Sequence, residues 1–280
     1  MTAIPEYKNR ANVLGIGIDA VNMQQALARI AYELEQRRKG YVCLAGVHGV
    51  MEGQRNPEVA RVFAGAALVA PDGMPTVWVG HHQGHAQMER VTGPDLMLEV
   101  IKREEFRGYT HFFCGGKEGV AEELRDSLVA RFPFAKIAGT YTPPFGPLSV
   151  EQEKELIEIV DHLKPDIIWV GISTPKQELF MERYLPLLDT TLMFAVGAAF
   201  DFHTGRIADC AEWIKRCGLQ WLHRLLQDPK HLWKRYLQNN PMFLFSIALQ
   251  LTGLRSYPPQ TYSRPHDIPQ PAWAKSRTSR

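Results

Sequence analysis

The sequence has few cysteines, and none of them is placed for a disulfide framework or a zinc site. Its 280 residues include four, at positions 43, 114, 210 and 217, with no CxxC pair and no Cys/His spacing typical of zinc. We therefore expect reduced, mostly buried thiols in a reducing compartment. With 45% hydrophobic and 22% charged residues, the composition also excludes a disordered or collagen-like chain.

Long apolar segments are also missing. The first residues, MTAIPEYKNRANVLG, carry charges without an apolar stretch behind them, so they do not resemble a signal peptide. The longest uncharged apolar run, Met242 to Leu254, is interrupted by Ser246, Gln250 and Thr252. It is shorter than the roughly 20 apolar residues that a membrane-spanning helix needs. We expect a cytoplasmic protein without a transmembrane helix.

Short apolar runs alternate with amphipathic segments over the first three quarters of the chain. The runs predict strands at 12–17, 41–45, 67–70, 111–114, 136–139, 167–171 and 192–196. Helices are expected from Asn22, which begins a capping box with Gln25, and at 57–63, 94–106, 117–132, 150–163 and from about Pro175. Strands that are apolar on both faces predict a Rossmann-like α/β core over residues 1–207, with a mostly parallel sheet covered by helices on both faces.

The composition changes in residues 208–255, where no strand pattern appears. From Ala211 to Arg255 there are seven Lys and Arg residues against two acidic ones, and three of the six tryptophans. Indoles favour membrane interfaces, and basic residues are attracted to anionic lipid. We expect a helical appendage that docks on a membrane, although an ordinary helical subdomain with a solvated basic face would have the same pattern. Residues 256–280, with five prolines and no periodicity, are expected to form a disordered tail.

Asp72, in the segment PDGMP, is the candidate catalytic residue. It follows a predicted strand, and ligands bind at the carboxyl ends of strands in such folds. A carboxylate there can act as a general base that deprotonates an acceptor hydroxyl. The alternative is that Asp72 only caps the next helix or forms an Asx turn.

Other candidates for ligand binding follow further strands. Gly115, Gly116 and the next helix are placed to approach a diphosphate, or form only a tight turn. Lys176 and Gln177 begin a helix after a strand, where they would point into the same crevice. Asp201, between two phenylalanines, is suited to a base or ribose, or to a structural hydrogen bond.

Basic residues and one histidine complete the set. Arg224, Lys234 and Arg235 are the cations of the appendage proposed for a diphosphate. His48 follows the second core strand and would face the crevice, or serve only a structural role. A net charge of +2 is too small for a nucleic-acid binder, so none is expected as a partner.

Seven segments, in order across residues 12–240, resemble the WecG/TagA/CpsF glycosyltransferases, also called glycosyltransferase family 26. They are PDGMP, ERVTGPDLM, FFCGGKEGVAEEL, TYTPPF, GISTPKQE, VGAAFDF and GLQWLHRLLQDPKHLWKRYL. The resemblance implies an inverting, metal-independent transferase that moves a sugar from a UDP-sugar to a polyprenyl-diphosphate-linked sugar. It also implies that the appendage docks on the inner face of the cytoplasmic membrane and completes the active site.

The resemblance also implies roles for particular residues. Asp72 matches the proposed base, and Arg90, Gln177 and Arg224 match substrate-binding residues. His231 stands where many relatives carry arginine, while the next two basic residues of the appendage keep positive charge. The predicted nucleotide site comprises Gly115, Gly116, Tyr141, Lys176 and Asp201.

One departure from the family concerns the second core strand. Many relatives carry a Thr-x-Asn element after it, but here the stretch reads CLAGVHGV. We expect His48 to replace part of these contacts, and a glucosyltransferase is as plausible as an N-acetylmannosamine (or its uronic acid) transferase.

The expected reaction is a single in-line displacement. Asp72 takes the acceptor proton, and cations and helix N-termini stabilise the leaving diphosphate, since no DxD metal motif is present and no cofactor is expected. A nucleotide-dependent oxidoreductase is a weaker alternative, because the chain lacks GxGxxG. A non-enzymatic membrane module is another. The apolar appendage is also expected to favour a homo-oligomer when no membrane is present.

Overall fold

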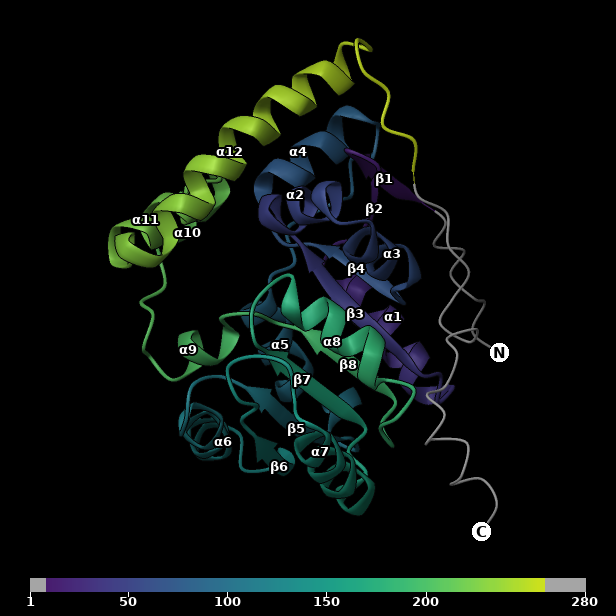
Figure 1. Cartoon of the computed structure of the whole chain (residues 1–280), viewed down its shortest axis with the longest axis vertical. Coiled ribbons are helices and arrows are strands. Elements are labelled where there is room, and N and C mark those ends of the chain that lie inside the picture. Colours follow the sequence, from purple (N-terminus) through teal and green to yellow (C-terminus); the bar gives the residue numbers. More distant parts are fainter. Residues whose placement is uncertain (1–8, 260–280) are drawn as a thin grey trace.

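The centre of the molecule is a six-stranded parallel sheet with the order β4-β3-β8-β7-β5-β6 (Figure 1). The computed structural model describes residues 9–259. The strands are β3 (Gly40–Ala45), β4 (Leu68–Pro71), β5 (Thr110–Gly115), β6 (Lys136–Tyr141), β7 (Ile167–Gly171) and β8 (Leu192–Ala195). Every pairing between them is parallel, so the carboxyl ends of all six strands meet at one edge of the sheet.

Helices cover both faces of this sheet, as the strand composition predicts. Along β3, Tyr41 and Cys43 join one hydrophobic core while Val42 and Leu44 join the other. The first core is closed by α2 (Val47–Arg55), α3 (Pro57–Gly65), α7 (Val150–Leu163) and α8 (Lys176–Tyr184). The second core is closed by α1 (Met23–Glu35), α5 (Gly93–Lys102), the short helix η1 (Glu104–Phe106), α6 (Val120–Arg131) and α9 (Ala199–His203).

The first predicted strand, 12–17, is instead a hairpin. β1 (Arg10–Val13) and β2 (Ile16–Asp19) pair antiparallel in a separate two-stranded sheet. The chain reverses at Leu14 and Gly15, whose φ angles of 52° and 83° lie in the left-handed region. Glycine adopts such angles readily but leucine does not, so Leu14 gave no indication in the sequence that the chain turns here.

The C-terminal helices are α10 (Glu212–Arg216), α11 (Gln220–Gln227) and α12 (Pro229–Leu251). Figure 1 shows α12 as a long arm beside α2 and α4 (Met74–His82). Its Phe243 and Ile247 are buried in the first core. The helical character of the appendage is confirmed, and its last helix is anchored on the α/β core.

The chain beyond α12 packs on the hairpin. Tyr257 is buried, and the Asn12 side chain donates a hydrogen bond of 2.8 Å to its carbonyl oxygen. The disorder predicted for 256–280 therefore does not hold at Tyr257, because this contact fixes the chain; residues 260–280 lie outside the described residues. Within residues 9–259, no helix combines the length and apolar character needed to cross a bilayer.

Candidate active site

A cleft of about 1840 Å³ opens at the carboxyl edge of the sheet. Its inner wall consists of the segments that follow β3, β4, β7 and β8, and the loop 142–148 adds to one side. α11 and α12 form much of the outer wall. The cleft therefore lies where the parallel topology directs ligands, and the appendage takes part in forming it.

Asp72 lies in this cleft, directly after β4. Its carboxylate accepts a hydrogen bond from the backbone N–H of Gly93, at the start of α5. A Cβ atom built on Gly46, after the neighbouring strand β3, would lie 3.5 Å from Asp72 Oδ2. The two strand ends thus meet at this carboxylate.

The environment of Asp72 disfavours its charge. Burial raises the pKa of Asp72 to about 7, although Arg90 and the Gly93 hydrogen bond lower it and Asp95 adds to the rise. The side chain keeps partial exposure in the cleft. A carboxyl with a pKa near neutral can accept a proton and release it again at physiological pH, as a general base requires.

Arg90 connects the core to the appendage. Its guanidinium donates a hydrogen bond of 3.2 Å to Gln220 Oε1 on α11 and lies 3.5 Å from Asp95 Oδ2 on α5. The Thr92 hydroxyl, 2.6 Å from the same carboxylate oxygen, orients Asp95. This arrangement holds Arg90 beside Asp72, where its charge lowers the pKa of the carboxyl.

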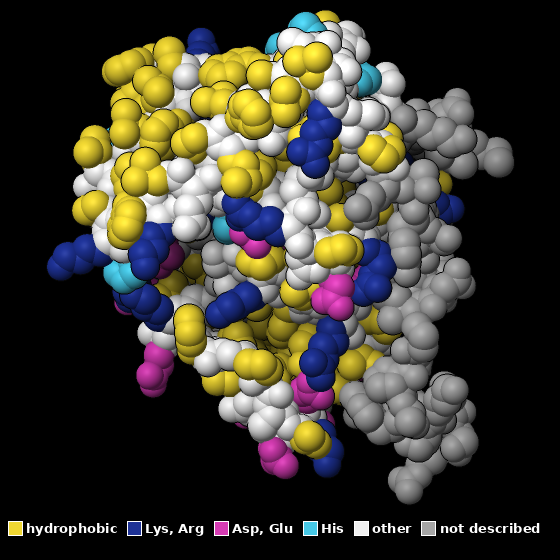
Figure 2. All heavy atoms as spheres, turned by 45° about the horizontal axis from the view of Figure 1, so that its top comes forward, with side chains coloured by type: hydrophobic (Ala, Val, Ile, Leu, Met, Phe, Trp, Pro, Cys, Tyr) yellow, Lys and Arg dark blue, Asp and Glu magenta, His cyan; other side chains and the backbone are white. Residues whose placement is uncertain are grey.

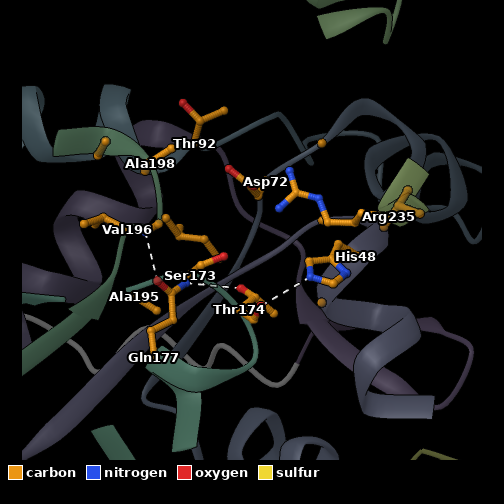
Figure 3. Close-up of a pocket in the computed structure, with 18 of the residues that line it drawn as sticks. His48, Asp72, Thr92, Ser173, Thr174, Gln177, Ala195, Val196, Ala198 and Arg235 are labelled. Carbon is orange, nitrogen blue, oxygen red and sulfur yellow. Dashed lines mark hydrogen bonds between the residues drawn. The ribbon is translucent and has the colours of Figure 1, made fainter. Parts of the chain in front are cut away.

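Two further arginines reach the cleft from the appendage. The Arg224 guanidinium lies 5.4 Å from the centre of the Phe202 ring, and its charge also lowers the pKa of Asp72. Arg235 points from α12 toward Asp72 (Figure 3). Lys234 does not line the cleft: it is exposed, with its ammonium 5.6 Å from the Trp233 ring centre. Successive helix residues are about 100° apart, so α12 directs only one of these two basic side chains inward.

His48 joins α2 to α12. Its Nε2 lies 3.3 Å from the Thr174 carbonyl oxygen (Figure 3), and its Nδ1 lies 3.0 Å from Asn239 Nδ2. Burial and the nearby Arg235 lower the pKa of His48, which favours a neutral ring that donates through Nε2 and accepts through Nδ1. Asn239 is 3% exposed and was not identified from the sequence.

Gln177 lines the cleft, but its amide already has protein partners. Its Oε1 accepts a hydrogen bond of 3.0 Å from the backbone N–H of Gly197, and its Nε2 donates to Thr174 Oγ1 and Glu178 Oε1, both at 3.2 Å. The side chain is 3% exposed. These contacts fix the loop between β8 and α9 against α8, so the observed role of Gln177 is to position the cleft wall.

The residues predicted for the nucleotide lie around the other half of the cleft. Gly116, Lys176 and Asp201 line it, whereas Gly115 and Tyr141 do not. Gly115 has a φ of 136°, and a Cβ atom there would lie 2.7 Å from the Gly171 backbone, so this glycine allows two strands to approach closely. Tyr141 packs against the first core.

The loop 142–148 brings an unexpected aromatic residue to this half of the cleft. Phe145 is fully exposed, and the Lys176 ammonium lies 4.1 Å from the centre of its ring. Among the described residues, no group of three or more His, Cys, Asp or Glu side chains is placed to hold a metal ion. The charges that act on Asp72 come from two arginines, Arg90 and Arg224, and one carboxylate, Asp95, so they are mainly cationic. Such an arrangement is suited to a diphosphate.

Three of these contacts were not predicted: Gln220 with Arg90, Asp95 with Arg90, and Asn239 with His48. Asp95 could have been found from the sequence, because it stands in the first turn of a helix that follows Thr92. The contacts of Gln220 and Asn239 could not have been predicted from local sequence, since each contacts a residue more than one hundred positions away.

Comparisons with known proteins identify the family of this chain. An N-acetylglucosaminyldiphosphoundecaprenol N-acetyl-beta-D-mannosaminyltransferase of Bacillus spizizenii is 26% identical over 204 residues, which are 73% of this chain and 77% of that protein. The protein of the same name from Bacillus subtilis is 23% identical over 215 residues, or 73% of this chain and 81% of that protein. The model of the glycosyl transferase WecG/TagA/CpsF family matches residues 11–257. The chain therefore belongs to the WecG/TagA/CpsF family and is a glycosyltransferase.

Proposed function

We propose that this enzyme transfers a sugar from a UDP-sugar to a sugar carried on a polyprenyl diphosphate, with inversion at the anomeric carbon and without a metal ion. The single observation that carries the proposal is the position of Asp72, a carboxyl with a pKa near 7 in a cleft that it shares with Arg90, Arg224 and Arg235. Membership of a glycosyltransferase family argues against the two alternatives, a nucleotide-dependent oxidoreductase and a non-enzymatic membrane module.

In the proposed reaction, the Asp72 carboxylate accepts the proton of the acceptor hydroxyl. The hydroxyl oxygen attacks the anomeric carbon while the bond from that carbon to the UDP oxygen breaks on the opposite side. Arg90, Arg224 and Arg235 stabilise the negative charge that develops on the leaving diphosphate. Gly116, Lys176 and Asp201 are proposed to hold the nucleotide, and Gln177 holds the wall between the two substrates.

The acceptor is proposed to reach this site from the inner face of the cytoplasmic membrane. The C-terminal helices expose large apolar side chains beside basic ones, and Figure 2 shows hydrophobic side chains gathered on the face of the molecule that they form, with Lys and Arg around them. Exposed apolar side chains flanked by basic residues favour the surface of an anionic bilayer. The protein is thus proposed to act as a peripheral membrane enzyme.

The donor sugar depends on the end of β3. The relatives from Bacillus are named for transfer of N-acetyl-β-D-mannosamine to an N-acetylglucosaminyl diphosphoundecaprenol, and these are the first substrates to test. The His48–Asn239 pair stands near the expected sugar position, where many relatives are expected to carry Thr-x-Asn. Glucose therefore remains the second donor proposed.

The test is a transfer assay with purified protein, synthetic polyprenyl-diphosphate N-acetylglucosamine in vesicles, and a panel of UDP-sugars. We expect acceptor-dependent release of UDP with one donor, unchanged activity in EDTA, and a product of inverted anomeric configuration by NMR. Release that is independent of the acceptor, or that is lost in EDTA and restored by a divalent cation, would contradict the proposal.

A further inference from the structure

An apolar groove leads away from Asp72 between α4 and α12. We call it the α4–α12 groove; its walls are Trp78, Val79, Phe243, Leu244, Ile247 and Leu251, all of which line the same cleft as Asp72. α4 begins two residues after Asp72, so one wall of the groove starts at the catalytic carboxyl.

The far end of the groove is fixed by the hairpin. Gln83, just after α4, exchanges hydrogen bonds of 2.8 and 2.7 Å with the backbone of Asn12. Gln250, near the end of α12, donates to the same Asn12 carbonyl at 2.7 Å and accepts from the N–H of Leu14 at 2.8 Å. Both helices are thus held together at the turn of the hairpin.

One stripe of α12 faces the cleft from Arg235 to Leu251, and its chemistry changes along the way. Residues at every fourth position, Arg235, Asn239, Phe243, Ile247 and Leu251, all line the cleft. Side chains four apart lie on one face of a helix. The stripe is polar beside His48 and becomes apolar one turn later, toward the hairpin.

The groove has a buried floor and exposed rims. Val79, Phe243 and Ile247 are 4%, 2% and 8% exposed, whereas Trp78, Leu244 and Leu251 are 48%, 66% and 38% exposed. His82 at the end of α4 is the polar exception in the lining. Exposed apolar rims that border a catalytic cleft are typical of a site for an apolar ligand.

We propose that the α4–α12 groove binds the first isoprene units of the acceptor's polyprenyl tail, an inference that rests on the function proposed above. In such an acceptor the order is sugar, diphosphate, tail. The order in the molecule is the same: Asp72, then the polar part of the α12 stripe beside His48, then the apolar walls. α4 is about 13 Å long at 1.5 Å per residue, which matches roughly two or three isoprene units.

The experiment compares two soluble acceptors without vesicles. Both are N-acetylglucosamine diphosphates; one carries a methyl group and the other three isoprene units. We expect kcat/KM for the prenylated acceptor to be at least about tenfold higher, because the groove removes the apolar chain from water. Leu244→Asn should raise KM about tenfold for the prenylated acceptor and leave the methyl acceptor unchanged.

Phe245→Asn is the matched control. Phe245 is the next residue on α12 and, like Leu244, is 66% exposed, but it does not line the cleft. It should leave the preference for the prenylated acceptor intact, and circular dichroism should show both variants folded.

Three results would overturn the inference. They are equal use of both acceptors by the wild type, equal effects of the two variants, and loss of the prenyl preference when a short-chain phospholipid is added below its micelle concentration. The last would assign the groove to a membrane acyl chain. Transfer to neither acceptor would overturn the proposed function itself, and this inference with it.

Discussion

At the scale of single residues, the pKa of Asp72 is determined mainly by desolvation, which outweighs the interactions that favour the charged carboxylate. Two arginines and a backbone N–H favour the charged carboxylate, yet burial raises its pKa from 3.8 to about 7. A buried charge that is not fully compensated lowers the stability of a protein, and such groups are common at active sites. The cost is expected to appear in the pH dependence of stability.

Asp72→Asn should make the protein more stable at pH 8. Between about pH 4 and 7 the native state binds more protons at Asp72 than the unfolded state does, so the free energy of unfolding falls as pH rises through this window. Removing the charge should raise that free energy by about 1–3 kcal/mol at pH 8 and change it little at pH 4. Urea denaturation at both pH values measures it, and a loss of stability at pH 8 would contradict it.

Sequence alone predicted that Asp72 lies in the cleft, because parallel strands direct their carboxyl ends to a common edge. It did not identify the inward direction of Arg235 over Lys234, since α12 has apolar side chains both in the core and on its exposed side. It also did not find Asn239, whose contact with His48 spans 191 positions. Such pairs depend on where an appended helix docks, which local pattern does not encode.

At the scale of elements, the strands were the most predictable part of the fold. β3, β5, β7 and β8 are fully or nearly fully buried, and continuous apolar runs signal such strands. α2 and α4 were missed because glycine, proline and histidine interrupt their helical pattern. Both helices form walls of the cleft, so the helices that were not predicted lie next to the site.

The C-terminal end of α12 is held on the hairpin by hydrogen bonds of the Gln250 side chain. Gln250→Leu should free it from the hairpin, since the variant loses hydrogen bonds to Asn12 and Leu14. We expect the local opening free energy of residues 243–251 to fall by about 1–3 kcal/mol. Hydrogen exchange measures this, and Gln238→Leu, at an exposed position of the same helix, should leave the exchange unchanged. Equal exchange in the two variants would show that the anchor is elsewhere.

At the scale of the whole molecule, the C-terminal helices contribute both to the cleft and to an exposed apolar surface. They close the outer wall of the cleft and also expose Trp213, Leu226 and Trp233, which are 64%, 75% and 47% accessible. Exposed apolar area of this kind is covered by a partner in solution or by lipid. We therefore predict self-association without a membrane and monomeric binding to vesicles.

Binding to vesicles should depend on both charge and apolar contact. The wild type should bind anionic vesicles more tightly than neutral ones, and high salt should weaken this difference, since each basic residue contributes about 1 kcal/mol near an anionic surface. Trp213→Ser combined with Leu226→Ser should weaken binding about tenfold or more. Val150→Ser, an exposed apolar position on α7, is the control in a sedimentation assay. Equal binding by all three proteins would contradict the proposed docking surface.

The central claim is that Asp72 removes the acceptor proton. Its most direct test compares wild type, Asp72→Asn and Asp126→Asn, a change at an exposed aspartate on α6 outside the cleft, in acceptor-dependent UDP release and in UDP binding by calorimetry. We predict that Asp72→Asn lowers kcat by about 10²–10⁴-fold with UDP affinity nearly unchanged, while Asp126→Asn behaves as wild type. Turnover by Asp72→Asn close to that of the wild type would show that the base lies elsewhere.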